Sequence, residues 1–130
     1  MSEPRWLERS DVEELHQIMI EIGGGADGLR DQNLLESALA RPRNQFAYGE
    51  EDLFRLAATY AEGIARNHPF VDGNKRSALT SATVFLFANG FDLSAEKEDE
   101  HADMMVALAK GDIGGDEVAE HFRAYSEPAK

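Results

Sequence analysis

The segment from Asn74 to Asn89 is apolar on almost every side when it is arranged as a helix. A helix at a protein surface carries its apolar side chains on one stripe, so a helix that is apolar nearly all round is expected to be buried. Gly90 follows this segment as a suitable carboxyl-terminal cap. The chain is therefore predicted to fold around a central helix. Its apolar residues are Ala78, Leu79, Ala82, Thr83, Val84, Phe85, Leu86 and Phe87.

Helical spacing of apolar residues recurs along most of the remaining chain, and it predicts an all-α fold. Ser10 and Glu13 have the spacing of a capping box at the start of a first helix. Asp31 is expected to cap a second helix, which Pro42 should end. Residues 43–50 show no helical stripe and are predicted to form a loop or a short hairpin. Three further helices are predicted at about residues 52–67, 98–109 and 116–125.

Two features of the amino-terminal third are interpreted as structural. His16 lies within the first helix and is interpreted as a surface or half-buried histidine. The glycine-rich run at residues 23–28 lacks the preceding strand and the Gly-Lys-Ser/Thr ending of a phosphate-binding loop. We therefore interpret this run as a flexible connector between helices.

Composition limits the size and location of the protein. The 130 residues suit a single domain that spans residues 1–130. The chain has no cysteine, so packing alone must hold it together, as is compatible with a reducing cytoplasm. Its start lacks the layout of a signal peptide, and no apolar stretch is long enough to span a bilayer. We expect a cytoplasmic protein without a membrane partner.

Charge is distributed unevenly. A formal net charge of −12 argues against direct nucleic-acid binding, which normally requires a basic surface. Between residues 63 and 91, however, Asp72 is the only acidic residue. The same segment carries the basic side chains of Arg66, Lys75 and Arg76. This pattern indicates a site for a small anion. The alternative is that the segment is simply the buried middle of the fold, where acidic residues are scarce in any case. The sequence does not decide whether Arg66 touches a substrate.

The start of the central helix has the properties of a phosphate site. The first N–H groups of a helix have no partners within it, and the helix dipole adds partial positive charge at the same place. Gly73 allows the backbone to approach an anion closely. Asn74 can donate from its amide, and Lys75 and Arg76 add full positive charges. Residues 73–76 are therefore predicted to bind phosphate.

The segment just before this helix contributes three more residues to a candidate catalytic loop. The Asp72 carboxylate would repel a nearby phosphate unless a divalent metal lay between them, so Asp72 is interpreted as a magnesium ligand. The alternative is that Asp72 only caps the helix. His68 can accept a proton near neutral pH, although a histidine bonded to backbone at a helix end is the alternative. Phe70 is expected to bury itself under the loop as a structural anchor.

These residues resemble a known signature. His68, Pro69, Phe70, Asp72, Gly73, Asn74, Lys75 and Arg76 match the motif of the Fic/Doc superfamily. The turn at residues 28–31 and the helix at residues 35–38 look like the death-on-curing (Doc) branch of that superfamily. The resemblance implies a compact helical fold with the motif loop between two central helices. It also implies Mg²⁺ as cofactor, ATP as co-substrate, His68 as base, Asp72 as metal ligand and residues 73–76 as the phosphate site.

The resemblance extends to an activity. The AMP-transferring Fic pattern has Gly where this chain has Lys75, and a second Arg where it has Leu79. Both differences resemble the Doc branch, which implies a toxin that acts as a protein serine/threonine kinase on a threonine of elongation factor Tu and so arrests translation. Residues 59–63 come one residue short of the inhibitory motif of Fic proteins, so a cognate antitoxin is expected as partner. The alternatives are an AMP transferase and a catalytically idle antitoxin-binding module.

Overall fold

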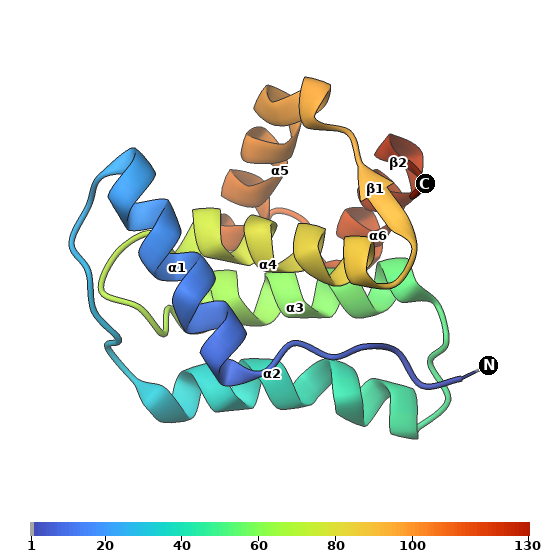
Figure 1. The fold of residues 1–130 in the computed structure, drawn as a ribbon, viewed down its shortest axis with the longest axis horizontal. Coiled ribbons are helices and arrows are strands. Elements are labelled where there is room, and N and C mark those ends of the chain that lie inside the picture. The colour runs from blue at the N-terminus through green and yellow to red at the C-terminus, as the bar shows by residue number, and fades with distance from the viewer. Residues whose placement is uncertain (1) are drawn as a thin grey trace.

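The computed structural model describes residues 2–130, which form six α-helices, one 3₁₀ helix and two short strands (Figure 1). The elements are α1 (Arg9–Gly23), α2 (Gln32–Ala47), α3 (Leu53–Asn67), α4 (Asn74–Ala88), β1 (Phe91–Leu93), η1 (Ala95–Lys97), α5 (Glu98–Lys110), α6 (Gly115–Tyr125) and β2 (Ser126–Pro128). The predicted all-α class is confirmed. None of the helices within residues 2–130 combines the length and the apolar character that a membrane crossing needs.

Helices α3 and α4 form the centre of the molecule. They lie side by side, with α2 against α3, α1 across α4, and α5 and α6 on the remaining side (Figure 1). Helix α3 is the more deeply buried of the two, whereas α4 leaves Phe87 60% exposed at its far end. The loop at residues 68–73 joins these two helices, so the predicted placement of the motif between two central helices is confirmed.

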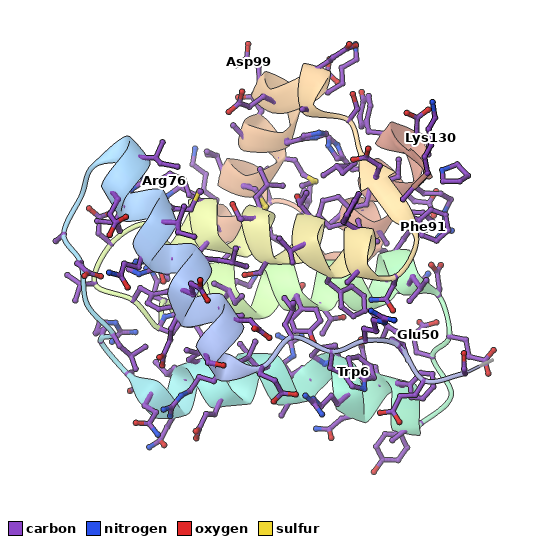
Figure 2. All side chains as sticks on the ribbon, in the orientation of Figure 1. Trp6, Glu50, Arg76, Phe91, Asp99 and Lys130 are labelled. Atoms are coloured by element: carbon purple, nitrogen blue, oxygen red, sulfur yellow. The ribbon has the colours of Figure 1, made fainter. Side chains whose placement is uncertain are left out.

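The segment before α1 is held against the core by aromatic contacts (Figure 2). The Trp6 ring stacks on Phe85 at 6.0 Å between centroids and meets Phe46 edge-on at 5.7 Å. The buried Tyr60 hydroxyl accepts a hydrogen bond from the Leu7 N–H at 3.1 Å, and burial raises the pKa of Tyr60 to about 12. Because Leu7 is fixed in this way, the chain enters α1 earlier than predicted.

The cap of α1 is accordingly Glu8, and the prediction of Ser10 was wrong. The Asp11 carboxylate accepts the Glu8 N–H at 2.8 Å, so the capping box lies two residues before the predicted pair of Ser10 and Glu13. The predicted cap of α2 is confirmed, because Asp31 accepts the Leu34 N–H at 3.0 Å.

Helix α2 continues past Pro42 to Ala47, so both the predicted end at Pro42 and the hairpin near residues 43–50 were wrong. A proline removes one hydrogen bond from a helix interior, and tertiary contacts can offset that loss. Beyond Pro42, the Phe46 ring packs on the core, and the Thr59 hydroxyl donates to the Gln45 side chain at 2.6 Å. The two strands lie elsewhere: β1 pairs antiparallel with β2, after α4 and α6 respectively.

Candidate functional site

The loop at residues 68–73 begins and ends with left-handed backbone. His68 follows the last residue of α3 with φ 51° and ψ 54°, and Gly73 precedes the first residue of α4 with φ 75°. The predicted end of α3 before His68 is confirmed, because Pro69 disfavours helical geometry at the residue before it. The loop therefore places an exposed imidazole beside the amino end of α4.

A buried stack lies beneath the loop. Phe70 is 2% exposed, and its ring lies parallel to that of His16 at 3.8 Å between centroids. His16 Nε2 lies 2.7 Å from the Asp72 carbonyl oxygen, and because a carbonyl only accepts, this nitrogen carries the proton. His16 is 2% exposed, so its interpretation as a surface or half-buried residue was wrong. Its helical spacing from the buried Val12 and Ile20 was the signal for its burial.

Asn74 closes the loop on itself. Its side-chain oxygen accepts the Phe70 N–H at 3.0 Å, and its side-chain nitrogen donates to the Phe70 carbonyl at 3.0 Å. The same nitrogen lies 3.4 Å from His68 Nδ1. The amide group that the sequence suggested for phosphate is thus directed at the loop, and only the backbone of this residue remains for an anion.

Asp72 presents an exposed carboxylate at the mouth of the site. One oxygen accepts the Gly73 N–H at 2.8 Å, and the other accepts the Ala26 N–H at 3.3 Å. These two hydrogen bonds, with the nearby Arg76 charge, lower the pKa of Asp72. The ionised carboxylate suits magnesium, which prefers hard oxygen ligands and completes its shell with water and phosphate. Within residues 2–130 no group of three or more acidic or histidine side chains gathers to hold a metal, so Asp72 would be the one side-chain ligand.

The two basic residues of the motif differ in their surroundings. Lys75 is exposed on the first turn of α4. Arg76 instead reaches the end of α1, where its guanidinium donates to the carbonyls of Met19 at 3.2 Å and Gly24 at 2.9 Å. It lies near the junction of α1 and α4, as labelled in Figure 2. Arg76 therefore places a positive charge near the site, while its hydrogen bonds hold the start of the connector at residues 23–28.

Arg66 points away from the site. It donates to the Leu108 carbonyl at 3.2 Å and to the Ile113 carbonyl at 2.7 Å, and it forms an ion pair with Glu62 at 3.1 Å. These contacts join α3 to the end of α5 and to the turn before α6. In this arrangement Arg66 has a structural role.

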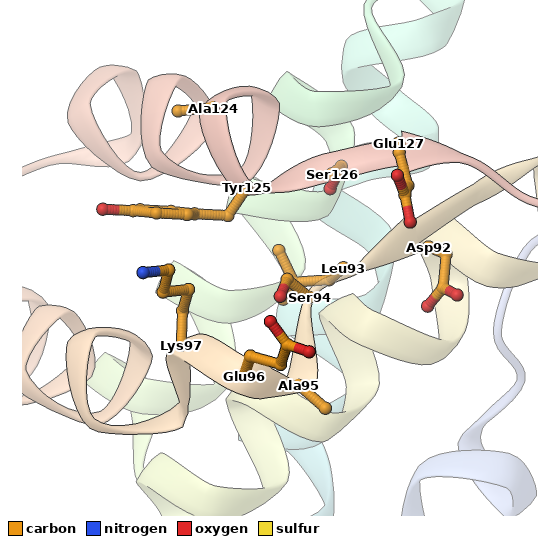
Figure 3. Close-up of a pocket in the computed structure, with 10 residues that line it drawn as sticks. All are labelled: Asp92, Leu93, Ser94, Ala95, Glu96, Lys97, Ala124, Tyr125, Ser126 and Glu127. Atoms are coloured by element: carbon orange, nitrogen blue, oxygen red, sulfur yellow. The ribbon is translucent and has the colours of Figure 1, made fainter.

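A cleft of about 330 Å³ opens at the motif. It is lined by His68, Val71, Asp72, Gly73, Asn74, Lys75 and Arg76. A larger hollow, of about 570 Å³, lies beside the β1–β2 sheet (Figure 3). Its lining includes Lys97, Tyr125 and Glu127 and no residue of the motif. The smaller cleft is thus the one that combines an imidazole, a carboxylate and a helix amino end.

The fold and the loop together define a class of all-helical proteins in which a His-Pro-Phe loop joins two central helices. The model of the Fic/DOC family matches residues 6–86, which reach from the segment before α1 to nearly the end of α4. Because this match covers more than half of the chain, the protein belongs to the Fic/DOC family.

Two relatives are similar over almost their whole length. The protein named Protein kinase doc of Escherichia phage P1 is 38% identical over 120 residues, which are 92% of this chain and 94% of the relative. The protein named Toxin Doc of Mycolicibacterium smegmatis is 36% identical over 129 residues, which are 96% of each chain. The resemblance to the Doc branch is therefore confirmed.

Proposed function

We propose that this protein is the toxin of a toxin–antitoxin pair and a protein serine/threonine kinase that transfers the γ-phosphate of ATP to a threonine of elongation factor Tu. The names of the two relatives, a kinase and a toxin, support this proposal. The observation that carries it is the placement of the His68 imidazole and the Asp72 carboxylate in one cleft at the amino end of a buried helix.

The phosphates of the nucleotide are proposed to bind at the first turn of α4. Gly73 has a positive φ, and a Cβ atom at this position would lie 3.1 Å from Ile20 Cδ1, so the turn into α4 requires glycine. The backbone N–H groups at residues 74–76 and the exposed Lys75 then face the phosphates. Asp72 would hold magnesium, which neutralises phosphate charge during transfer.

His68 is proposed to act as the general base. The threonine oxygen forms a bond to the γ-phosphorus, the bond from that phosphorus to the bridging oxygen breaks, and ADP leaves. The hydroxyl proton passes to the imidazole of His68. Most of the rate enhancement in phosphoryl transfer comes from positioning and charge stabilisation, which suits a site with few reactive groups.

The central experiment uses purified elongation factor Tu and ATP labelled on either the α- or the γ-phosphate. We expect label from the γ-position on the target and none from the α-position. Label from the α-phosphate on the target would show that the protein is an AMP transferase and not a kinase. Transfer of neither label, together with no growth arrest when the protein is expressed without its antitoxin, would favour the idle antitoxin-binding module.

Two variants of the site make this experiment specific. We expect His68→Ala to lower the transfer rate by a factor of about 10² to 10⁴, the usual contribution of a general base. Asp72→Asn should abolish transfer at magnesium concentrations that saturate the unchanged protein. Asp103→Asn removes an exposed carboxylate from α5 and should leave transfer unchanged. A fully toxic His68→Ala or Asp72→Asn variant would contradict the assigned roles.

A cognate antitoxin is proposed to cover an apolar hollow of about 380 Å³ between α1 and α4. Leu15, Ile18 and Val84 line this hollow, and the acidic and exposed Asp11 and Glu14 line it as well. An amphipathic helix with apolar anchors and a basic rim fits this surface. We expect Ile18→Lys to stop co-purification of the antitoxin encoded beside this protein, whereas Tyr48→Lys, at a fully exposed position on α2's end, should not. Retained co-purification of the Ile18 variant would exclude this surface.

A further inference from the structure

Three consecutive backbone carbonyls around His68 are held by one short segment. The Arg30 guanidinium donates to the Asn67 carbonyl at 3.0 Å through Nη2, and to the His68 carbonyl at 2.7 Å through Nε. The backbone N–H groups of Arg30 and Asp31 both donate to the Pro69 carbonyl, at 2.7 and 3.0 Å. The residue before His68, His68 itself and the residue after it are therefore all fixed from the 28–31 turn.

The hydrogen bonds from Arg30 and Asp31 hold a strained stretch of backbone at His68. His68 is the one non-glycine residue within the described part of the chain that has a positive φ. The left-handed conformation costs an ordinary residue about 1–2 kcal/mol, so it persists only where the surroundings enforce it. The Leu29–Phe70 bridge and the hydrogen bond from the Val71 N–H to the Gly28 carbonyl at 3.0 Å continue the same pairing along the loop.

We propose that Arg30 is a positioning residue that holds the His68 imidazole in its productive place; this inference rests on the proposed kinase function. Arg30 is not among the residues that line the motif cleft, and its side chain donates to the Asn67 and His68 carbonyls, so its influence on the reaction passes through the His68 backbone. Its planar fork serves two successive carbonyls at once, which the single ammonium group of a lysine cannot do in the same geometry. Its positive charge also faces the carbonyl end of α3, where it is favourable.

The first test reads His68 directly by NMR of histidine labelled in the ring, with His68→Ala to assign the signal. Arg30→Lys and Arg30→Met should shift and broaden the His68 signal, while the signals of His101 and His121 stay unchanged and report an intact fold. Arg9→Lys, on the exposed face of α1, is the matched control and should leave all four histidines as they are. An unchanged His68 signal in both Arg30 variants would overturn the proposal.

The second test measures phosphate transfer. Arg30→Lys should lower kcat about tenfold or more with KM for ATP unchanged, because a base that is slightly misplaced loses rate and not binding. In a His68→Ala background the same change should have no further effect, since its influence passes through His68. A full additional loss in that background would refute positioning. If the unchanged protein transfers no phosphate, the proposed kinase function is wrong. The role of Arg30 in holding His68 is then still decided by the NMR experiment.

Discussion

His16 joins two parts of the candidate site, because its ring supports Phe70 and its Nε2 donates to the Asp72 carbonyl. His16→Leu would keep an apolar side chain of similar size but leave that carbonyl without its partner. We expect the free energy of unfolding to fall by about 1–3 kcal/mol, which is the usual cost of an orphaned polar group. Urea unfolding followed by circular dichroism measures this change.

Gln17→Leu is the matched control, because it makes the same kind of change at the next, exposed position of α1. It should alter stability by less than about 0.5 kcal/mol. Equal effects of the two substitutions would show that His16 does not support the loop.

Residue identities at the site could be recognised from the sequence, whereas the directions of their side chains could not. The Asn74 side chain binds Phe70, and the Arg76 side chain binds the carbonyls of Met19 and Gly24. Both choices depend on where distant backbone carbonyls lie after folding, and no local pattern encodes that. For the same reason, the sequence did not reveal that Arg30 binds the carbonyls of Asn67 and His68, which lie 37 and 38 positions further along the chain.

Helices α2 and α3 lie close together at Gly63 and Ala38. A Cβ atom on Gly63 would lie 2.9 Å from the Ala38 Cβ and 3.1 Å from its Cα, closer than side chains tolerate. Alanine in a helix interior is normally about 1 kcal/mol better than glycine, but overpacking costs about 1–3 kcal/mol. We therefore expect Gly63→Ala to lower the melting temperature, contrary to its helix propensity.

The double variant Gly63→Ala with Ala38→Gly tests the cause. It moves the methyl group from one helix to the other, so it should recover most of the stability lost in the single variant. A Gly63→Ala protein that melts at a higher temperature than the unchanged chain would disprove the close contact.

Helix positions follow from apolar spacing, whereas helix ends depend on tertiary contacts. The spacing predicted all six α-helices close to where they lie, because each buries a periodic stripe. The end of α2 was missed, since the packing of Phe46 outweighs the interruption at Pro42. The start of α1 was missed for a similar reason, because Leu7 is anchored to Tyr60 on α3.

Across the whole molecule, the chain's carboxyl-terminal segment returns to the end of α4. Strand β2 pairs with β1 through Phe91 with Pro128 and Leu93 with Ser126. Strands of three residues are too short to show a period of two, so the sequence pattern did not predict them. The sheet closes the side of the core opposite the motif cleft, next to α5 and α6 (Figure 1).

A histidine pair lies beside this sheet and connects α5 to α6. His101 Nε2 lies 2.7 Å from the Ser94 carbonyl, so it carries a proton, and His101 Nδ1 is left to accept from His121 Nε2 at 2.7 Å. Burial, followed by the nearby His101, lowers the pKa of His121, and Glu100 opposes that shift only in part. The folded protein therefore resists protonation at this place more than the unfolded chain does.

The pH dependence of stability follows from that difference. As the pH falls below about 6.5, the ordinary pKa of histidine, the unfolded chain binds the proton that the folded state resists, so the free energy of unfolding must decrease. The contribution of His121 to stability is complete above that pH and is lost on the acidic side.

The variant His121→Gln keeps an N–H donor for His101 but does not titrate. The free energy of unfolding of this variant should therefore change less between pH 7.5 and about 5.5 than that of the unchanged protein. Urea unfolding at a series of pH values compares the two proteins, with Gln17→Leu as the control, because it changes an exposed residue that does not titrate and should keep the original slope. Parallel curves for the unchanged protein and His121→Gln would show that the histidine pair does not link acid to stability.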